Sequence, residues 1–181
     1  QTFSQFRINP EEFILKAARL INDEKATQII EHITYNRLDA AYDQDVFTRA
    51  TLRGKLDVNA MEANRSLYSH VIYDSDNERR FAQELDVSDQ VAVYVKLPGS
   101  FYISTPVGKY NPDWAIAFNE GSVKHIYFVA ETKGNLDTME LRGVENAKIE
   151  CAKKHFAAIS NGSVVYSVVD NYSTLMQLVS N

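Results

Sequence analysis

Two neighbouring stretches decide the fold: DWAIAF (residues 113–118) and, after a short polar turn, VKHIYFVAETK (residues 123–133). Successive side chains of a strand point to opposite faces, so the large Trp, Ile and Phe of the first stretch face one way and its two alanines the other. Both faces are therefore apolar, which is typical of a sheet that is covered on both sides. We predict a β-hairpin between layers of helices, a three-layer α/β/α fold.

The sequence around this hairpin predicts further helices and strands. Ser75 or Asp76 is suited to cap a helix over residues 74–86, DSDNERRFAQELD, which has one apolar face. A second helix is predicted over residues 141–160 from its apolar spacing and the Asn-Gly pair that follows it. Strands are predicted at 67–73, 90–98, 101–106 and 163–170, the last being the final element.

The N-terminal region has a different pattern. Apolar residues recur at helical spacing over residues 10–38, with a polar break at residues 22–23. Its first turn, a Pro followed by two Glu, is typical of a helix start. No element is predicted for residues 39–66. We therefore divide the chain into an N-terminal helical or connector segment, residues 1–66, and a core, residues 67–181.

Composition excludes several classes of protein. The chain has 181 residues, a formal net charge of −5, an apolar fraction of 45% and one Cys. These values argue against disorder and against a disulfide framework. No apolar run reaches the roughly 18 residues of a membrane helix, and no secretion signal begins the chain. We expect a cytoplasmic protein with no membrane partner. The acidic charge is not typical of a nucleic-acid binder, so such a function must depend on local residues.

Charged residues stand at one end of both strands of the hairpin. Asp113, directly after Pro112, opens the first strand, and Glu131 and Lys133 close the second. Residues two apart on a strand share a face, so Glu131 and Lys133 project together. Charges at the end of strands that are apolar on both faces need a partner or a metal ion.

The length of the turn decides whether Asp113 joins this pair. A three-residue loop at 120–122, to which its Gly is suited, pairs Asn119 with Val123 and puts Asp113 opposite Val129. Asp113 then shares the face of the two charged residues of the second strand. A two-residue loop would place it on the other face. We predict the three-residue loop.

Two carboxylates and the backbone carbonyl of Thr132 would form an all-oxygen site that suits Mg²⁺. Such an ion neutralises charge on phosphoryl oxygens and lowers the pKa of a bound water. Lys133 is placed to orient that water, and Glu78, on the preceding predicted helix, adds a further oxygen ligand, directly or through water. The pattern alone also fits a turn-capping Asp113 and a solvated strand end, and this alternative stays open.

Longer runs around these residues carry a resemblance to a known family: DSDNERRFAQEL (74–85), VYVKLPGSFYISTP (93–106), TPVGKYNPDWAIAF (105–118), YFVAETKG (127–134) and ENAKIECAKKHF (145–156). They resemble the nuclease domain at the C-terminal end of the restriction subunit of type III restriction enzymes, in the PD-(D/E)XK superfamily. The resemblance implies a restriction-endonuclease-like core with a mixed sheet. It also implies a catalytic triad of Asp113, Glu131 and Lys133, with Glu78 as the acidic residue of the first core helix.

The resemblance further implies Mg²⁺-dependent, site-specific cleavage of double-stranded DNA in a bacterial cytoplasm. Its implied partners are a methyltransferase (Mod) subunit and an ATP-dependent translocase domain. The chain contains no phosphate-binding GxxxxGK[ST] motif, so ATP would act only through a motor domain outside it. Lys148 on the predicted helix after the site, and Lys109 before it, are expected to contact DNA phosphates.

Two other functions remain open at this point. A non-catalytic DNA-binding or subunit-docking module could keep the same fold without a working metal site. Another PD-(D/E)XK nuclease, such as a repair enzyme, would share the site but not the long similar runs around it.

Overall fold

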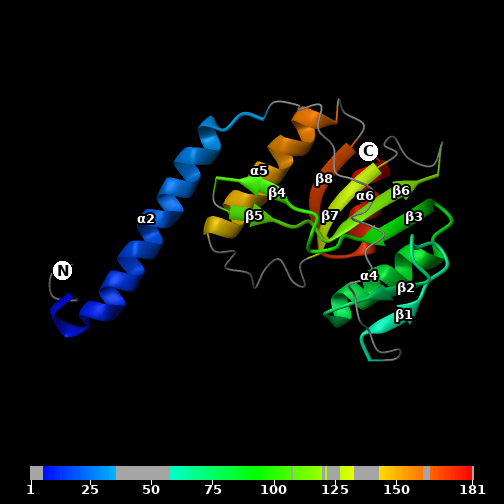
Figure 1. Ribbon diagram of the computed structural model, residues 1–181, viewed down its shortest axis with the longest axis horizontal. Coiled ribbons are helices and arrows are strands. Elements are labelled where there is room, and N and C mark those ends of the chain that lie inside the picture. The colour runs from blue at the N-terminus through cyan, green and yellow to red at the C-terminus, as the bar shows by residue number, and fades with distance from the viewer. Residues whose placement is uncertain are drawn as a thin grey trace.

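A four-stranded mixed sheet in the order β3-β6-β7-β8 forms the centre of this computed structural model (Figure 1). β3 (Val91–Lys96) pairs antiparallel with β6 (Trp114–Phe118). β6 pairs antiparallel with β7 (Tyr127–Thr132), and β7 pairs parallel with β8 (Val164–Val169). The structure describes residues 6–35, 58–106, 108–119, 121, 127–132, 143–160 and 164–180.

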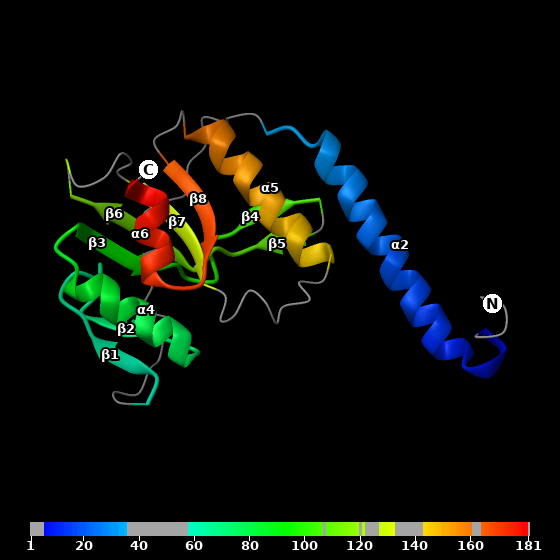
Figure 2. The same cartoon turned by 180° about the vertical axis from the view of Figure 1, so that it is seen from behind.

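Buried residues form two core clusters that the sheet separates. The side chains of β6 alternate between them: its Trp, Ile and Phe lie in the first cluster, and Ala115 packs against the second. The first cluster includes residues of α4 (Asp76–Val87) and α6 (Tyr172–Ser180), and the second includes residues of α5 (Gly143–Ile159). Figure 2 shows α4 and α6 in front of the sheet. The chain is therefore a mixed α/β protein whose central strands are apolar on both faces, as their sequence predicts.

The helix α4 begins where its sequence predicts. The side chain of Ser75 accepts a hydrogen bond of 3.2 Å from the backbone N–H of Glu78, which satisfies one of the donors at the helix start. Phe81, Ala82 and Leu85 form the buried face. The prediction of a capped amphipathic helix at this position is confirmed.

Two small antiparallel hairpins flank the central sheet. β1 (Ala60–Glu62) pairs with β2 (His70–Ile72), and β4 (Ile103–Thr105) pairs with β5 (Gly108–Tyr110). The backbone of Arg65 and Leu67 exchanges hydrogen bonds with Tyr94 and so partly covers the free edge of β3. This pairing limits the exposure of unpaired backbone groups at an edge strand.

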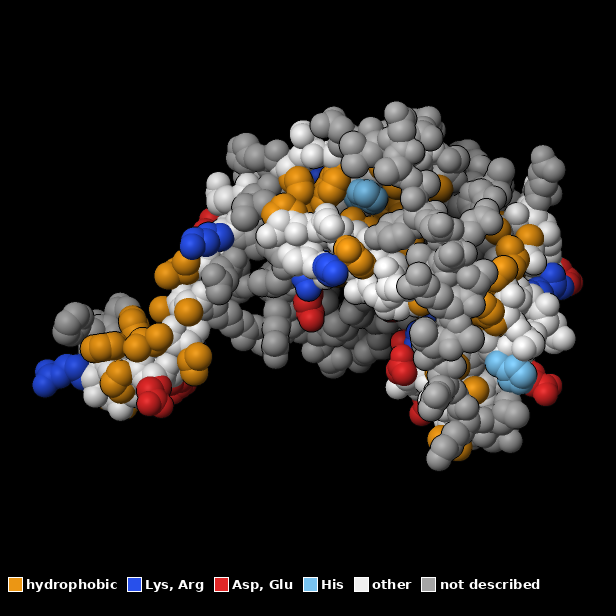
Figure 3. Space-filling model, viewed as in Figure 1, with side chains coloured by type: hydrophobic (Ala, Val, Ile, Leu, Met, Phe, Trp, Pro, Cys, Tyr) orange, Lys and Arg blue, Asp and Glu red, His pale blue; other side chains and the backbone are white. Residues whose placement is uncertain are grey.

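The helix α2 (Pro10–His32) extends away from the rest of the molecule (Figures 1 and 2). Asn9 caps it, because its side chain accepts a hydrogen bond of 3.1 Å from the backbone N–H of Glu12. Its C-terminal end approaches α5, where Tyr35 and His155 make an edge-to-face ring contact. Several large apolar side chains of α2 are exposed, namely Ile14, Leu15, Leu20 and Ile21. Figure 3 shows hydrophobic side chains, in orange, on the surface of the part of the molecule that extends away from the rest.

Four sequence predictions need correction. The chain ends in a helix, α6, rather than in the strand before it, and β1 and β5 were not predicted. α2 is one continuous helix with no break at residues 22–23, because polar side chains do not by themselves interrupt the backbone hydrogen bonds of a helix. The predicted strand at 67–73 is only three residues long, β2. The boundary at residues 66 and 67 stays a prediction.

Candidate active site at the end of the central sheet

Asp113 lies immediately before β6 and is fixed by both neighbouring strands. Its backbone carbonyl accepts a hydrogen bond of 2.7 Å from the N–H of Leu97, directly after β3. Its carboxylate oxygen Oδ2 accepts two hydrogen bonds from Thr132, the last residue of β7. The N–H of Thr132 lies 3.0 Å from Oδ2 and its hydroxyl lies 3.2 Å from it. Asp113 is therefore bonded to the neighbouring strands as well as to its own, which is more than a turn cap requires.

The register of the hairpin places Glu131 across from Asp113. Trp114 pairs with Ala130, and continuing this antiparallel register by one position brings Asp113 opposite Glu131. Residues that are directly opposite share a face of the sheet. The side chain of Glu131 and all of Lys133 lie outside the described part of the structure.

The predicted loop at 120–122 is wrong by two residues of register. Ala117 pairs with Tyr127, so the connection is longer than the predicted pairing of Asn119 with Val123 allows. The change is an even number of residues, and side chains alternate with a period of two, so the prediction that Asp113 and Glu131 share a face is unchanged.

Asn111 holds the chain just before Asp113. Its side-chain amide donates hydrogen bonds of 3.0 Å to the carbonyl of Gly99 and 2.6 Å to the carbonyl of Phe101. These two bonds anchor the approach to β6 against the loop after β3. The sequence analysis did not identify this role; the Asn directly before Pro112 was the available signal.

Glu78 lies on α4 and is bonded to a lysine. Its Oε2 atom lies 2.6 Å from the Nζ of Lys96 and 2.8 Å from the backbone N–H of Asp74. Asp74 makes a second ion pair with Lys96, at 2.7 Å. The side chains of Glu78 and Lys96 are only 14% and 19% exposed, so water screens this contact less than it would on an open surface.

Lys96 is the last residue of β3 and pairs across the sheet with Trp114. Burial alone would lower the pKa of Lys96, but hydrogen bonds to and attraction from the carboxylates of Asp74 and Glu78 outweigh it and raise that pKa. The structure therefore gives the predicted ligand Glu78 a cationic partner within the protein. Sequence analysis missed Lys96 because nothing in its local pattern differs from a solvated strand end.

The two lysines predicted to contact DNA both lie at the hairpin of β4 and β5. Lys109 is on β5, and its Nζ lies 3.9 Å from the centre of the Tyr102 ring, a cation–π contact. Lys148, on α5, packs over Gly108, where an added Cβ would lie 3.7 Å from its Cε. Gly108 has a φ of 114°, a conformation that favours glycine. The structure therefore brings Lys109 and Lys148 to one surface feature, directly before Asp113 in the chain.

Among the described side chains, no three His, Cys, Asp or Glu residues group as a metal site. Two possible ligands at the end of the sheet are described: the carboxylate of Asp113 and the backbone carbonyl of Thr132. Both present hard oxygen atoms of the kind Mg²⁺ prefers. Their chemistry fits such an ion, and Glu131 would supply a second carboxylate. The buried Cys151, on α5, contributes no such ligand and behaves as a small apolar side chain.

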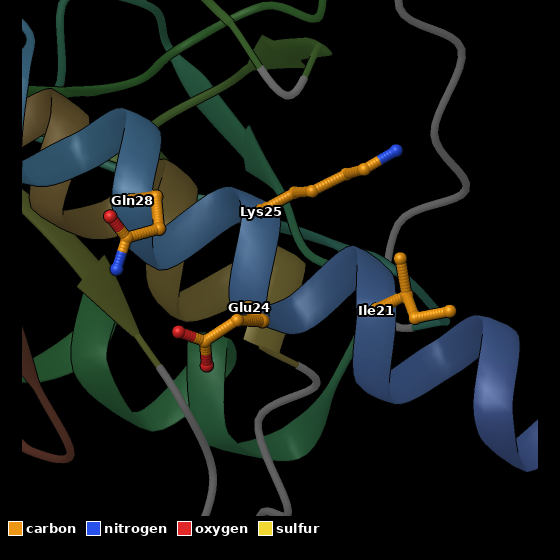
Figure 4. Close-up of a pocket in the computed structure, with 4 residues that line it drawn as sticks. All are labelled: Ile21, Glu24, Lys25 and Gln28. Atoms are coloured by element: carbon orange, nitrogen blue, oxygen red, sulfur yellow. The ribbon is translucent and has the colours of Figure 1, made fainter.

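A pocket of about 390 Å³ lies elsewhere, along α2 (Figure 4). It is lined by Ile21, Glu24, Lys25 and Gln28. None of the predicted site residues lies in it.

Among the helices that the structure describes, none is long and apolar enough to cross a membrane.

The mixed sheet, its helices and the carboxylate at the start of β6 define a mixed α/β domain that is compatible with a restriction-endonuclease-like fold. Comparison with known families agrees. A family model described as an endonuclease domain, of the restriction-endonuclease type, matches residues 64–172. That is more than half of the chain, so the chain belongs to this endonuclease-domain family and is a nuclease enzyme by membership. Searches of curated proteins and of solved structures gave no match.

Proposed function

We propose that this chain is the Mg²⁺-dependent nuclease domain of a type III restriction enzyme and that it cleaves phosphodiester bonds of double-stranded DNA. The observation that carries the proposal is the position of Asp113, bonded to the end of β7 and in register with Glu131. Membership of the endonuclease-domain family supports the reaction class. The similarity of residues 70–160 to type III enzymes supports the narrower assignment.

Asp113 and Glu131 would hold the ion, together with the backbone carbonyl of Thr132. When bound, Mg²⁺ would neutralise phosphoryl charge and acidify a water molecule. Glu78 would add a ligand, directly or through water. To do so, its Oε2 atom would give up its contact with Lys96 and bind the ion or its water instead. The proposed core is the three-layer restriction-endonuclease-like fold, supported by the separate clusters on the two faces of the sheet.

Lys133 would orient the attacking water and balance charge at the phosphate. The water would lose a proton to solvent as its oxygen bonds to phosphorus. The bond from phosphorus to the 3′ oxygen would break and that oxygen would take up a proton from solvent, which leaves a 5′-phosphate and a 3′-hydroxyl. Lys109 and Lys148, which meet at the hairpin of β4 and β5, would bind phosphates of the DNA strand.

The proposed partners are a methyltransferase (Mod) subunit and an ATP-dependent translocase domain, in a bacterial cytoplasm. They would account for the acidic charge of this chain, because most of the DNA-binding surface would belong to them. We therefore expect the chain by itself to bind DNA weakly.

Plasmid cleavage by the intact enzyme with Mg²⁺ tests the proposal directly. Asp113→Ala and Lys133→Ala should abolish cutting without unfolding the domain, because both residues act on the reacting phosphate. Cutting at the wild-type rate by Lys133→Ala would show the assignment to be wrong. A melting temperature of the chain that does not change at millimolar Mg²⁺ or Mn²⁺ would favour a non-catalytic docking module, since a ligand that binds only the folded state raises stability.

A further inference from the structure

A chain of hydrogen bonds runs from a buried indole to the carboxylate of Asp113. The indole Nε1–H of Trp114 donates to the hydroxyl oxygen of Thr132 at 3.2 Å. That hydroxyl lies 3.2 Å from Oδ2 of Asp113, and the N–H of Thr132 lies 3.0 Å from the same oxygen. Trp114 is fully buried and Thr132 is 8% exposed. These contacts connect the hydrophobic core to the candidate active site.

The chemistry of the three groups fixes the direction of the chain. An indole N–H only donates and a carboxylate only accepts, so the hydroxyl of Thr132 must accept from Trp114 and donate to Asp113. A buried indole N–H without an acceptor would be costly, and Thr132 supplies that acceptor. The hydroxyl therefore has one satisfied orientation, in which its proton points at Oδ2 of Asp113.

Both groups with which Thr132 donates to Oδ2 are neutral. They fix the rotation of the carboxylate but leave its negative charge in place, unlike an ammonium group. A carboxylate held in this way is pre-oriented for a cation, as carboxylates that ligate metals are when further hydrogen bonds orient them. Thr132, which accepts the hydrogen bond of the buried indole, thus also orients Asp113 to bind an ion.

We propose that Thr132 and Trp114 are positioning residues that orient the Asp113 carboxylate for the metal ion; this inference rests on the proposed function. The residue between Glu131 and Lys133 is then more than a spacer. Its side chain meets Trp114, whose ring lies in the first core cluster. A hydroxyl is needed at this position, and valine has the shape of threonine without that hydroxyl.

Calorimetric titration of the full 181-residue chain with Mn²⁺ tests the inference. Thr132→Val should raise the Mn²⁺ dissociation constant roughly tenfold. This is the lower end of the loss of affinity seen when a group that orients a metal ligand is removed. Thr132→Ser keeps a hydroxyl and should restore most of the affinity. Trp114→Phe removes the donor to that hydroxyl and should give a smaller loss than Thr132→Val.

The chain has a single tryptophan, so its indole N–H gives one resolved NMR signal. The chemical shift of that signal should change when Mg²⁺ is added to the wild type. In Thr132→Val the indole N–H proton should exchange faster with solvent, because it has lost its acceptor. Ile116→Val is the matched control, because it removes core volume on the same strand and face without touching Asp113. It should lower the melting temperature and leave the Mn²⁺ affinity unchanged.

The outcomes separate this inference from the proposed function. If the wild type does not bind Mn²⁺, both fail. If the wild type binds and Thr132→Val binds equally well, only the positioning role is wrong. If Thr132→Val does not fold, Trp114→Phe decides: unchanged affinity overturns the inference, and weakened affinity with an intact fold supports it.

Discussion

Asp113 and Glu78 lie near the same end of the central sheet but have partners of opposite kinds. Asp113 is bonded by neutral donors, the N–H and the hydroxyl of Thr132. Glu78 is bonded at 2.6 Å by the ammonium group of Lys96. Neutral donors orient a carboxylate and leave its charge available, whereas an ammonium group cancels that charge. The comparison is therefore between a carboxylate that Thr132 orients through neutral groups and a carboxylate that an ammonium group pairs.

The alternation of β3 and β6 explains why the two carboxylates meet different groups. Lys96 pairs with Trp114, whose ring belongs to the core cluster under α4, the helix that carries Glu78. Asp113 stands one residue earlier, next to Leu97, which belongs to the cluster under α5. Lys96 thus meets Glu78 on the side of α4, whereas the Asp113 carboxylate is held by Thr132 at the end of β7.

The largest expected effect comes from neutralising each carboxylate in turn. Asp113→Asn should abolish the rise of the melting temperature with Mn²⁺ and reduce DNA cleavage by about 1000-fold, because the metal supplies several kcal/mol to the transition state and each 1.36 kcal/mol is tenfold in rate. Glu78→Gln should keep part of the melting-temperature rise and reduce cleavage by roughly tenfold. Thermal unfolding with and without Mn²⁺, and plasmid cleavage by the intact enzyme, measure both. Equal losses in the two variants would contradict the distinction between them.

Removing the ammonium group that pairs with Glu78 should have an intermediate effect, on the stability of the fold. Lys96→Met leaves Glu78 with a mostly buried, unpaired charge and should lower the free energy of unfolding by about 1–2 kcal/mol, less than for a fully buried pair because water still reaches the contact. Urea denaturation measures the change.

The matched control is another lysine in an ion pair, Lys153, whose partner Glu150 lies on the same helix. Both side chains of that pair are about half exposed, at 46% and 50%. Lys153→Met should change the free energy of unfolding by less than about 0.5 kcal/mol, as is usual for exposed helical pairs. If Lys96→Met cost no more than this control, the contact with Glu78 would be an ordinary surface pair.

Much of the central fold could be predicted from short-range patterns. The period-two alternation of residues 113–118 and the cap at Ser75 are local signals, and the structure has the expected strand and helix at both positions. The face predicted for Asp113 depends only on whether the register is even or odd, so an error of two residues in the loop leaves that prediction unchanged.

The remaining features depend on contacts between distant parts of the chain. No local signal links Lys96 to Glu78, which are 18 residues apart, or Trp114 to Thr132, also 18 apart. The helix α6 was missed although Asn171 caps it, accepting a hydrogen bond of 2.9 Å from the N–H of Thr174. Its nine residues are too few for a strong helical pattern, and its place is fixed by the burial of Leu175 and Val179 in the core.

The smallest expected effect is a pH dependence of the ion pair. The folded state raises the pKa of Lys96 above the ordinary value of 10.5, so it binds the proton more tightly than the unfolded chain does. The stabilisation is complete below that ordinary value and is lost as the pH rises through the folded value, because the unfolded chain loses its proton first. The difference in unfolding free energy between the wild type and Lys96→Met should therefore shrink above a pH of about 10.

Urea denaturation of both proteins at increasing alkaline pH measures this difference. Burial and the nearby Asp86 also raise the pKa of Tyr94, which destabilises the folded state at high pH. Both proteins contain Tyr94, so its contribution cancels in the comparison. A difference that stayed constant across this range would mean that Lys96 stabilises the protein through the packing of its aliphatic chain rather than through its charge. The comparison of Glu78 with Asp113 would then fail, because it depends on the ion pair between Lys96 and Glu78.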